Sequence, residues 1–142
     1  EQAAELIHRG HKKLNKEVLK MGMFDDVIVT KNNELGLPIG NYQTKDLNSG
    51  LDVYEVLPDG RFIIRQHFTE GRYWNTVEPK KYPALAKGAT GIINIYGQLS
   101  GENVQDFNLH IEDGIVVKVT KYEYVENAKD IDFKEIIWEY DL

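Results

Sequence analysis

The 142-residue chain contains no cysteine, which excludes disulfides, thiolate metal ligands and cysteine nucleophiles and fits a reducing compartment. It has no run of about 20 apolar residues, so no membrane span is predicted. Neither Gly-x-x-x-x-Gly-Lys-Ser/Thr nor Gly-x-Gly-x-x-Gly occurs, which removes the usual signals of a phosphate-binding loop. With 42% hydrophobic and 28% charged residues the composition is that of a globular protein. We expect a cytoplasmic protein without a membrane partner.

The sequence offers no convincing catalytic or metal-binding set. His8 and His11 are three positions apart, but two histidines do not make a metal site, and we interpret them as surface residues. His67 falls on an expected strand without a nucleophile motif. The adjacent acids Asp25 and Asp26 would face opposite sides of a strand and could not act on one bond together. We therefore expect no catalytic residue, metal or cofactor, and favour a protein that is not an enzyme.

Charge is unevenly distributed along the chain. The net charge is −6, but residues 1–20 hold five basic and three acidic side chains, or +2, so the remainder carries −8. An acidic body repels nucleic acid and favours a basic partner. The basic N-terminal segment could contact nucleic acid or another anionic surface, or it could lie on the acidic tail after residue 125, which is the interpretation we favour.

Residues 1–22 are predicted to be an N-terminal helical extension, and residues 23–142 a single domain. Ile7, Leu14, Val18 and Met21 recur at spacings of seven, four and three, which is typical of one helix face. Such a stripe needs a partner, and one alternative is that it pairs two subunits of a homo-oligomer.

Short loops ending in glycine follow strand-like apolar runs at three places, residues 58–60, 69–71 and 112–114. Glycine there would take the left-handed conformation that closes an antiparallel hairpin. Closing the first loop places Val56 opposite Phe62 and Tyr54 opposite Ile64, which gives one apolar face.

A three-residue loop at 112–114 would likewise gather apolar side chains of the last hairpin on one face. The expected opposite pairs are Ile111 with Ile115, Leu109 with Val117, and Phe107 with Val119.

The remaining pattern predicts an α+β fold, mostly an antiparallel β-sheet meander with an N-terminal helix and a short C-terminal helix. Strands are expected within residues 23–30, 51–57, 61–68, 72–77, 89–99 and 104–125, with an irregular connection over 31–50. In the tail, Asp132 and Glu135 resemble a helix cap, whereas residues 134–140 alternate as a strand would, and we favour the helix.

Several short motifs resemble a group of small uncharacterised bacterial and phage proteins. They are Met23-Phe24-Asp25, Gln43-Thr44-Lys45-Asp46-Leu47, Asp59-Gly60-Arg61, Gly91-Ile92-Ile93-Asn94-Ile95-Tyr96 and Glu112-Asp113-Gly114. The resemblance covers about 100 residues, places the natural start near Met23, and makes residues 1–20 an extension that is either native or added. We know of no established activity for the group, so the resemblance implies only a phage or mobile-element origin in a bacterial host.

Two sets of residues are candidate binding residues. Gln43, Thr44, Lys45 and Asp46 lie in the long connection, where functional residues concentrate, although a hydrogen-bonded turn explains them equally well.

The second set lies on the expected hairpin around residue 65. Arg61, Arg65 and His67, facing Tyr73, would form a polar and aromatic patch that could bind an anion or a loop of a partner. A solvated sheet face is the plainer explanation of the same pattern.

The leading hypothesis is a non-enzymatic protein-binding factor, such as a phage or mobile-element inhibitor of a host component, whose acidity mimics nucleic acid toward a basic target. One alternative is a small-molecule or nucleotide-binding domain, with or without enzymatic activity, that uses the Arg61, Arg65, His67 and Tyr73 face. The other alternative is a structural oligomer paired through the N-terminal helix.

Overall fold

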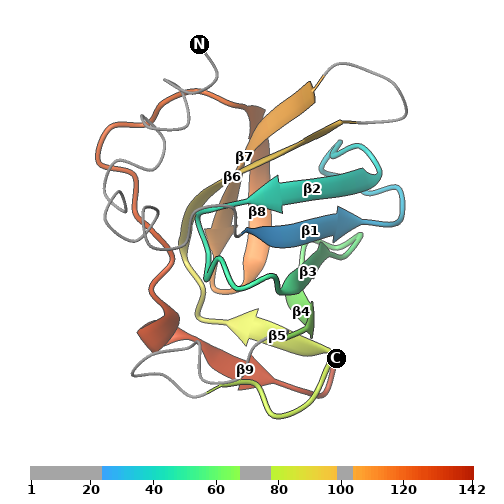
Figure 1. Ribbon diagram of the computed structural model, residues 1–142, viewed down its shortest axis with the longest axis vertical. Helices are drawn as coiled ribbons and strands as arrows, with labels where there is room; N and C mark the ends of the chain where they lie inside the picture. The colour runs from blue at the N-terminus through green and yellow to red at the C-terminus, as the bar shows by residue number, and fades with distance from the viewer. Residues whose placement is uncertain (1–23, 68–77, 99–103) are drawn as a thin grey trace.

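The computed structural model describes residues 24–67, 78–98 and 104–142, which form one nine-stranded sheet and a 3₁₀ turn. The elements are β1 (Asp25–Val29), β2 (Gly40–Thr44), β3 (Val53–Val56), β4 (Phe62–Gln66), β5 (Ala84–Lys87), β6 (Gly91–Gln98), β7 (Val104–Glu112), β8 (Ile115–Lys121), η2 (Phe133–Glu135) and β9 (Ile137–Glu139). The strand order in the sheet is β8-β7-β6-β2-β1-β3-β4-β5-β9 (Figure 1).

The predicted α+β antiparallel meander is wrong, because the sheet is mixed and the described residues contain no α-helix. β1 and β3 run parallel, with Val27 opposite Tyr54, while the other neighbouring strands are antiparallel. No helix in the described part of the chain is long and apolar enough to cross a membrane. The helix predicted for residues 1–22, the loop at 69–71 and the strand at 72–77 lie outside the described residues.

The predicted C-terminal helix is reduced to the three-residue turn η2. Asp132 caps that turn as expected, since its Oδ1 accepts a hydrogen bond from the Lys134 backbone amide at 3.0 Å. The chain then becomes extended at Ile136 and pairs with β5, which places Trp138 opposite Ala86 and against the core. Burial of the indole in a paired strand outweighs the weak local preference for a short helix.

β2 forms inside the connection that we predicted to be irregular. Its side chains alternate, with Tyr42 and Thr44 fully buried and Asn41 and Gln43 exposed. The Tyr42 ring packs edge-on against Phe107, with ring centroids 6.1 Å apart. Only two inward positions mark this strand, which is too short an alternation to separate it from a polar loop by sequence.

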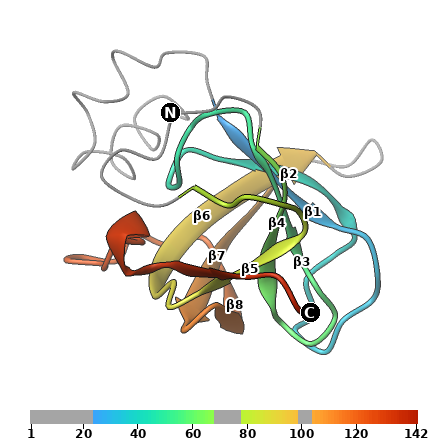
Figure 2. The same cartoon turned by 90° about the horizontal axis from the view of Figure 1, so that it is seen from below.

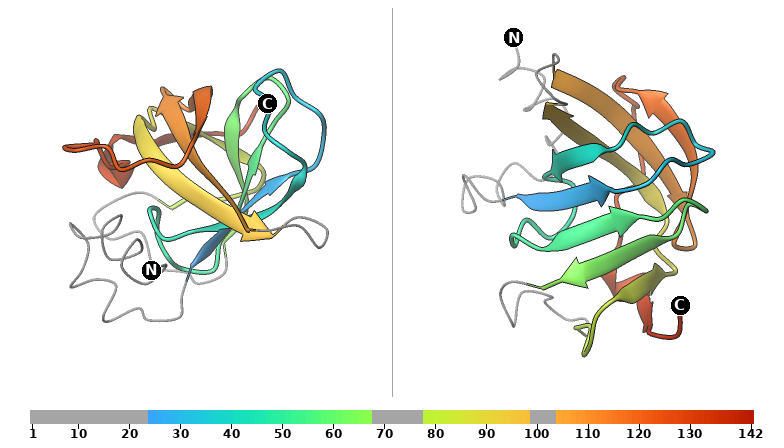
Figure 3. Two further views of the ribbon diagram at one scale, coloured as in Figure 1. Left: turned by 90° about the horizontal axis from the view of Figure 1, so that it is seen from above. Right: turned by 90° about the vertical axis from the view of Figure 1, so that its right-hand side faces the viewer.

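The sheet curls round a single interior, as the perpendicular views show (Figures 2 and 3). At one end it closes on itself, because Arg61 and Ile115 form an isolated β-bridge and the Phe62 amide donates to Gly114 O at 2.9 Å. A Cβ atom added to Gly60 would lie 2.7 Å from Val116 O, so glycine permits the contact between the two hairpins. The opposite end of the sheet, where β1 and β3 begin and β4 ends, carries Asp25, Asp52 and His67.

The predicted register of the β3–β4 hairpin is confirmed. Val56 lies opposite Phe62 and Tyr54 opposite Ile64, and all four side chains are buried in the interior. The Gly60 amide donates to Leu57 O at 2.8 Å and Gly60 has a φ of 94°, as a three-residue loop ending in a left-handed glycine requires.

The predicted register of the last hairpin is wrong. The loop has two residues, Asp113 and Gly114, both with positive φ, and Glu112 pairs with Ile115. The register then shifts by one residue, so that Leu109 lies opposite Val119 and Val117 is 48% exposed. A β-bulge thus restores the apolar face of the strand, because the extra residue returns Val119 to the core side.

Candidate functional site

The sheet opens between β2 and β6. The two strands are joined at Gln43 and Tyr96, close to Gly97, where an added Cβ would lie 2.6 Å from Asn41 O. Beyond this point β2 ends and leaves the edge of β6 to other acceptors. The backbone amide of Asn94 donates a hydrogen bond to Asp46 Oδ2 at 2.8 Å. The edge is therefore closed by a side chain in place of a strand.

The segment that follows β8 completes a cleft at this edge. The Tyr122 amide donates to Asp106 O at 3.0 Å on β7, and the Ile92 amide on β6 donates to Lys129 O at 2.9 Å. The segment therefore crosses the outer face of β7 and β6 before it reaches η2, and it descends in orange and red at the left of Figure 1. The cleft is lined by Asp46, Ile92, Asn94, Asn108, Tyr122, Glu123, Tyr124, Val125, Ala128 and Asp130.

The chemistry of this lining is acidic and aromatic. Three of the lining residues are carboxylic acids, two are tyrosines, and none is lysine, arginine or histidine. Lys129 of the same segment does not line the cleft, and its Nζ lies 3.3 Å from Glu135 Oε1. Such a surface attracts a cationic group and repels an anionic one.

Two buried amide side chains form the floor of the cleft. Asn94 and Asn108 lie opposite each other on β6 and β7, and they are only 6% and 2% exposed. Asn94 Nδ2 donates to Phe107 O at 3.0 Å and to the Asp106 carboxylate. Asn108 Nδ2 donates to Glu123 O at 2.9 Å. These bonds orient both amides, and within the described residues neither Oδ1 atom accepts a hydrogen bond.

The structure places the first predicted set, Gln43 to Asp46, in two environments. Gln43 is exposed on β2, whereas Thr44 is fully buried and its Oγ1 accepts a hydrogen bond from the Asp46 amide at 3.1 Å. The turn interpretation is thus right for Thr44. Asp46, by contrast, reaches a distant strand and lines the cleft, while Lys45 is partly exposed beside it.

The second predicted set is not brought together. Arg61 immediately precedes β4 and Arg65 lies near its end. Arg61 Nε is 2.8 Å from Asp59 Oδ2, and Arg65 Nε is 2.6 Å from Glu55 Oε1. Tyr73 lies outside the described residues. Each arginine is therefore engaged by its own carboxylate, and the pattern does not build a common anion site.

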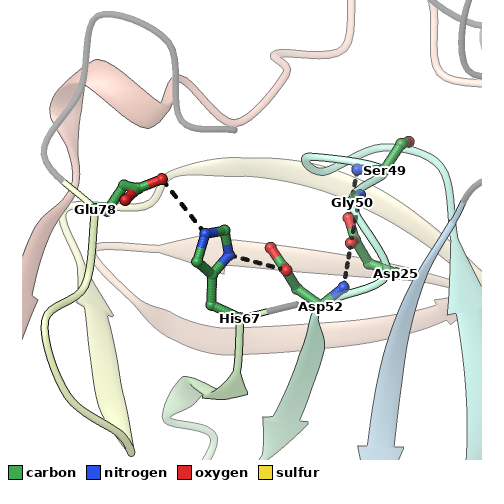
Figure 4. A network of polar contacts seen from close by, with 6 residues as sticks. All are labelled: Asp25, Ser49, Gly50, Asp52, His67 and Glu78. Carbon is green, nitrogen blue, oxygen red and sulfur yellow. Dashed lines mark hydrogen bonds and ion pairs between the residues drawn. The ribbon is translucent and has the colours of Figure 1, made fainter. Parts of the chain in front are cut away.

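The third member of that set, His67, belongs to a buried polar network shown in Figure 4. Its Nδ1 lies 3.0 Å from Asp52 Oδ1 and its Nε2 lies 3.4 Å from Glu78 Oε1. The His67 side chain is only 3% exposed, so the expected solvated strand position is wrong for this residue. The contact with Asp52 orients the ring, and the Glu78 carboxylate lies on the Nε2 side of the ring.

Asp25 anchors the same end of the sheet. Its carboxylate accepts hydrogen bonds from three backbone amides, Ser49 at 2.6 Å, Gly50 at 3.0 Å and Asp52 at 2.9 Å. Burial raises the pKa of Asp25 to about 6, because loss of water penalises the charged form more than the three donors favour it, and the nearby Asp52 carboxylate adds to the rise. The Asp25 side chain therefore fixes the loop that leads from Asp46 to β3.

Sequence reasoning missed Asp52, Asn94, Asn108 and the tyrosines of the cleft as functional candidates. They come from separate segments and share no local motif. The one sequence signal is that Asn94 is a polar residue within the otherwise apolar run Gly91–Tyr96. The side chains that form the polar contacts of the buried network are acids and a histidine, while Ser49 takes part through its backbone amide and its hydroxyl donates to Lys45 O at 3.5 Å. In the described part of the chain no three His, Cys, Asp or Glu side chains gather as metal ligands.

No protein-family model, curated protein or solved structure matches this chain. The resemblance to small bacterial and phage proteins therefore stays a prediction from short motifs.

Proposed function

We propose that the protein is a non-enzymatic binding factor whose cleft contacts a basic segment of another protein. The observation that carries this proposal is the lining of the cleft, which combines three carboxylic acids and two tyrosines with no basic side chain. Tyrosine is enriched at protein interfaces because its ring offers a large contact area and its hydroxyl a hydrogen bond.

The overall charge supports the same kind of partner. The chain carries −6, and a field of that sign accelerates encounter with a basic surface at low ionic strength. If the resemblance to phage proteins reflects origin, the partner is a host component and binding inhibits it. This part of the proposal rests on the motifs of the sequence alone.

The geometry near His67 favours binding over catalysis. A histidine base must reach a substrate proton, yet this side chain is almost fully buried between Asp52 and Glu78. The described network supports a structural role at the open end of the sheet.

The test compares the wild-type chain with two charge-matched double variants. Immobilised full-length protein is exposed to a bacterial lysate, and bound proteins are identified. Glu123→Gln with Asp130→Asn removes two of the three acidic groups of the cleft, while Glu34→Gln with Glu112→Gln neutralises two exposed acids away from it.

The proposal expects one protein to be recovered by the wild type and the control pair, but about fivefold less by the cleft pair, with binding weakened by added salt. Recovery of no reproducible partner, or equal recovery by both double variants, would contradict it.

A further inference from the structure

We infer that the group received by the cleft is the guanidinium of an arginine side chain carried by the partner protein. This inference rests on the proposed function and specifies its ligand. It is carried by the two buried amides on the floor of the cleft, together with the acids and rings around them.

The floor of the cleft supplies hydrogen-bond acceptors. Asn94 and Asn108 are each more than nine-tenths buried and line the cleft. Their Nδ2 atoms are used by protein acceptors, so the orientation of both amides is set. Their Oδ1 atoms receive no donor from the described residues, and neither oxygen is among the fully buried unpaired atoms, so both can be reached from the cleft. The cleft therefore favours a ligand that donates hydrogen bonds.

These acceptors lie on neighbouring positions of two paired strands. Asn94 and Asn108 are a directly opposed cross-strand pair, and such pairs have Cβ atoms about 4.5–5.5 Å apart. A guanidinium group presents five N–H donors in a rigid planar fork and can reach two neighbouring acceptors at once. An ammonium group is a compact point charge that has to lose more hydration to enter.

The lining also supplies negative charge and aromatic rings. The Asp46 carboxylate accepts a hydrogen bond from the backbone amide of Asn94 and lines the cleft. Glu123 and Asp130 add two further negative charges. Tyr122 and Tyr124 also line the cleft. Arginine combines ion pairing with stacking on aromatic rings, so both features of the lining favour it over lysine.

The experiment uses three blocked tripeptides that differ only in the central side chain: Gly-Arg-Gly, Gly-Lys-Gly and Gly-citrulline-Gly. Citrulline keeps the shape of arginine without its charge. The full-length ¹⁵N-labelled protein is titrated with each peptide, and the side-chain amide signals of Asn94 and Asn108 and the backbone amide signal of Asn94 are followed by NMR.

The inference expects the arginine peptide to shift these signals with at least about fivefold higher affinity than the lysine peptide, and citrulline to give no saturable shift. Glu123→Gln should weaken the arginine peptide, whereas the matched control Glu34→Gln should leave it unchanged. Equal affinity for arginine and lysine, shifts confined to other residues, or no saturable shift would each overturn the inference.

Failure of the inference is distinguishable from failure of the proposed function. If a partner is recovered from lysate through the cleft but the arginine peptide does not bind, the proposed function stands and the choice of arginine falls. If the arginine peptide binds but no partner depends on the cleft, the ligand chemistry stands and the role as a protein-binding factor falls.

Discussion

Asp46 and Asn94 are 48 positions apart in the chain, yet Asp46 Oδ2 accepts a hydrogen bond from the Asn94 backbone amide at 2.8 Å. This bond connects the loop after β2 to the edge of β6 and forms one wall of the cleft. It pairs the backbone N–H of Asn94 on β6, which has no partner strand there among the described residues because β2 ends at Thr44. The same contact therefore supports the fold and places a negative charge at the candidate site.

Asp46→Ala should destabilise the protein by about 1–3 kcal/mol, because the Asn94 amide loses a charged acceptor in a part-buried position. Urea unfolding followed by tryptophan fluorescence measures the change. Asp46→Asn keeps an acceptor oxygen and should cost less than Asp46→Ala. Equal losses for the two variants would show that the carboxylate oxygen is not the acceptor that matters.

Asp25→Asn should reduce the dependence of stability on pH. The folded-state pKa of Asp25 is raised to about 6 from 3.8, so the folded state binds the proton more tightly than the unfolded state. The contribution of Asp25 to the unfolding free energy is therefore greatest below pH 3.8 and is lost as pH rises through 6, by at most about 3 kcal/mol.

The measurement is the difference in unfolding free energy between wild type and Asp25→Asn at pH 4 and at pH 7. The variant cannot lose a proton at this position, so the difference should move in its favour at the higher pH, whatever constant cost the change in backbone acceptors adds. The same difference at both pH values would contradict the raised pKa.

Val116→Ala and Val117→Ala should differ although the residues are neighbours on β8. Val116 is 2% exposed in the core, and its truncation should cost about 2 kcal/mol, whereas Val117 is 48% exposed and should cost less than about 0.5 kcal/mol. Equilibrium unfolding in urea compares the two. The reverse ranking would restore the register expected from a three-residue loop.

The sequence alone was sufficient for the β3–β4 hairpin. Its register depends on Gly60, whose φ is positive, and on alternation over a few residues on each side, which are local properties. The inward face of Phe107, Leu109 and Ile111 followed from the same alternation. Of the candidate site, sequence reasoning singled out Asp46, because it lies in a long connection rich in turn-forming residues.

Tertiary structure decided what depends on contacts between distant segments. These features are the parallel pairing of β1 with β3, the extra residue at Val117 and the short strand β9 that carries Trp138, and no local pattern encodes them. Asn94 and Asn108 became one site only because β6 pairs with β7 and the segment after β8 crosses over both. Local alternation determines which side of a strand is apolar, whereas the choice of neighbouring strand depends on the packing of the whole curled sheet.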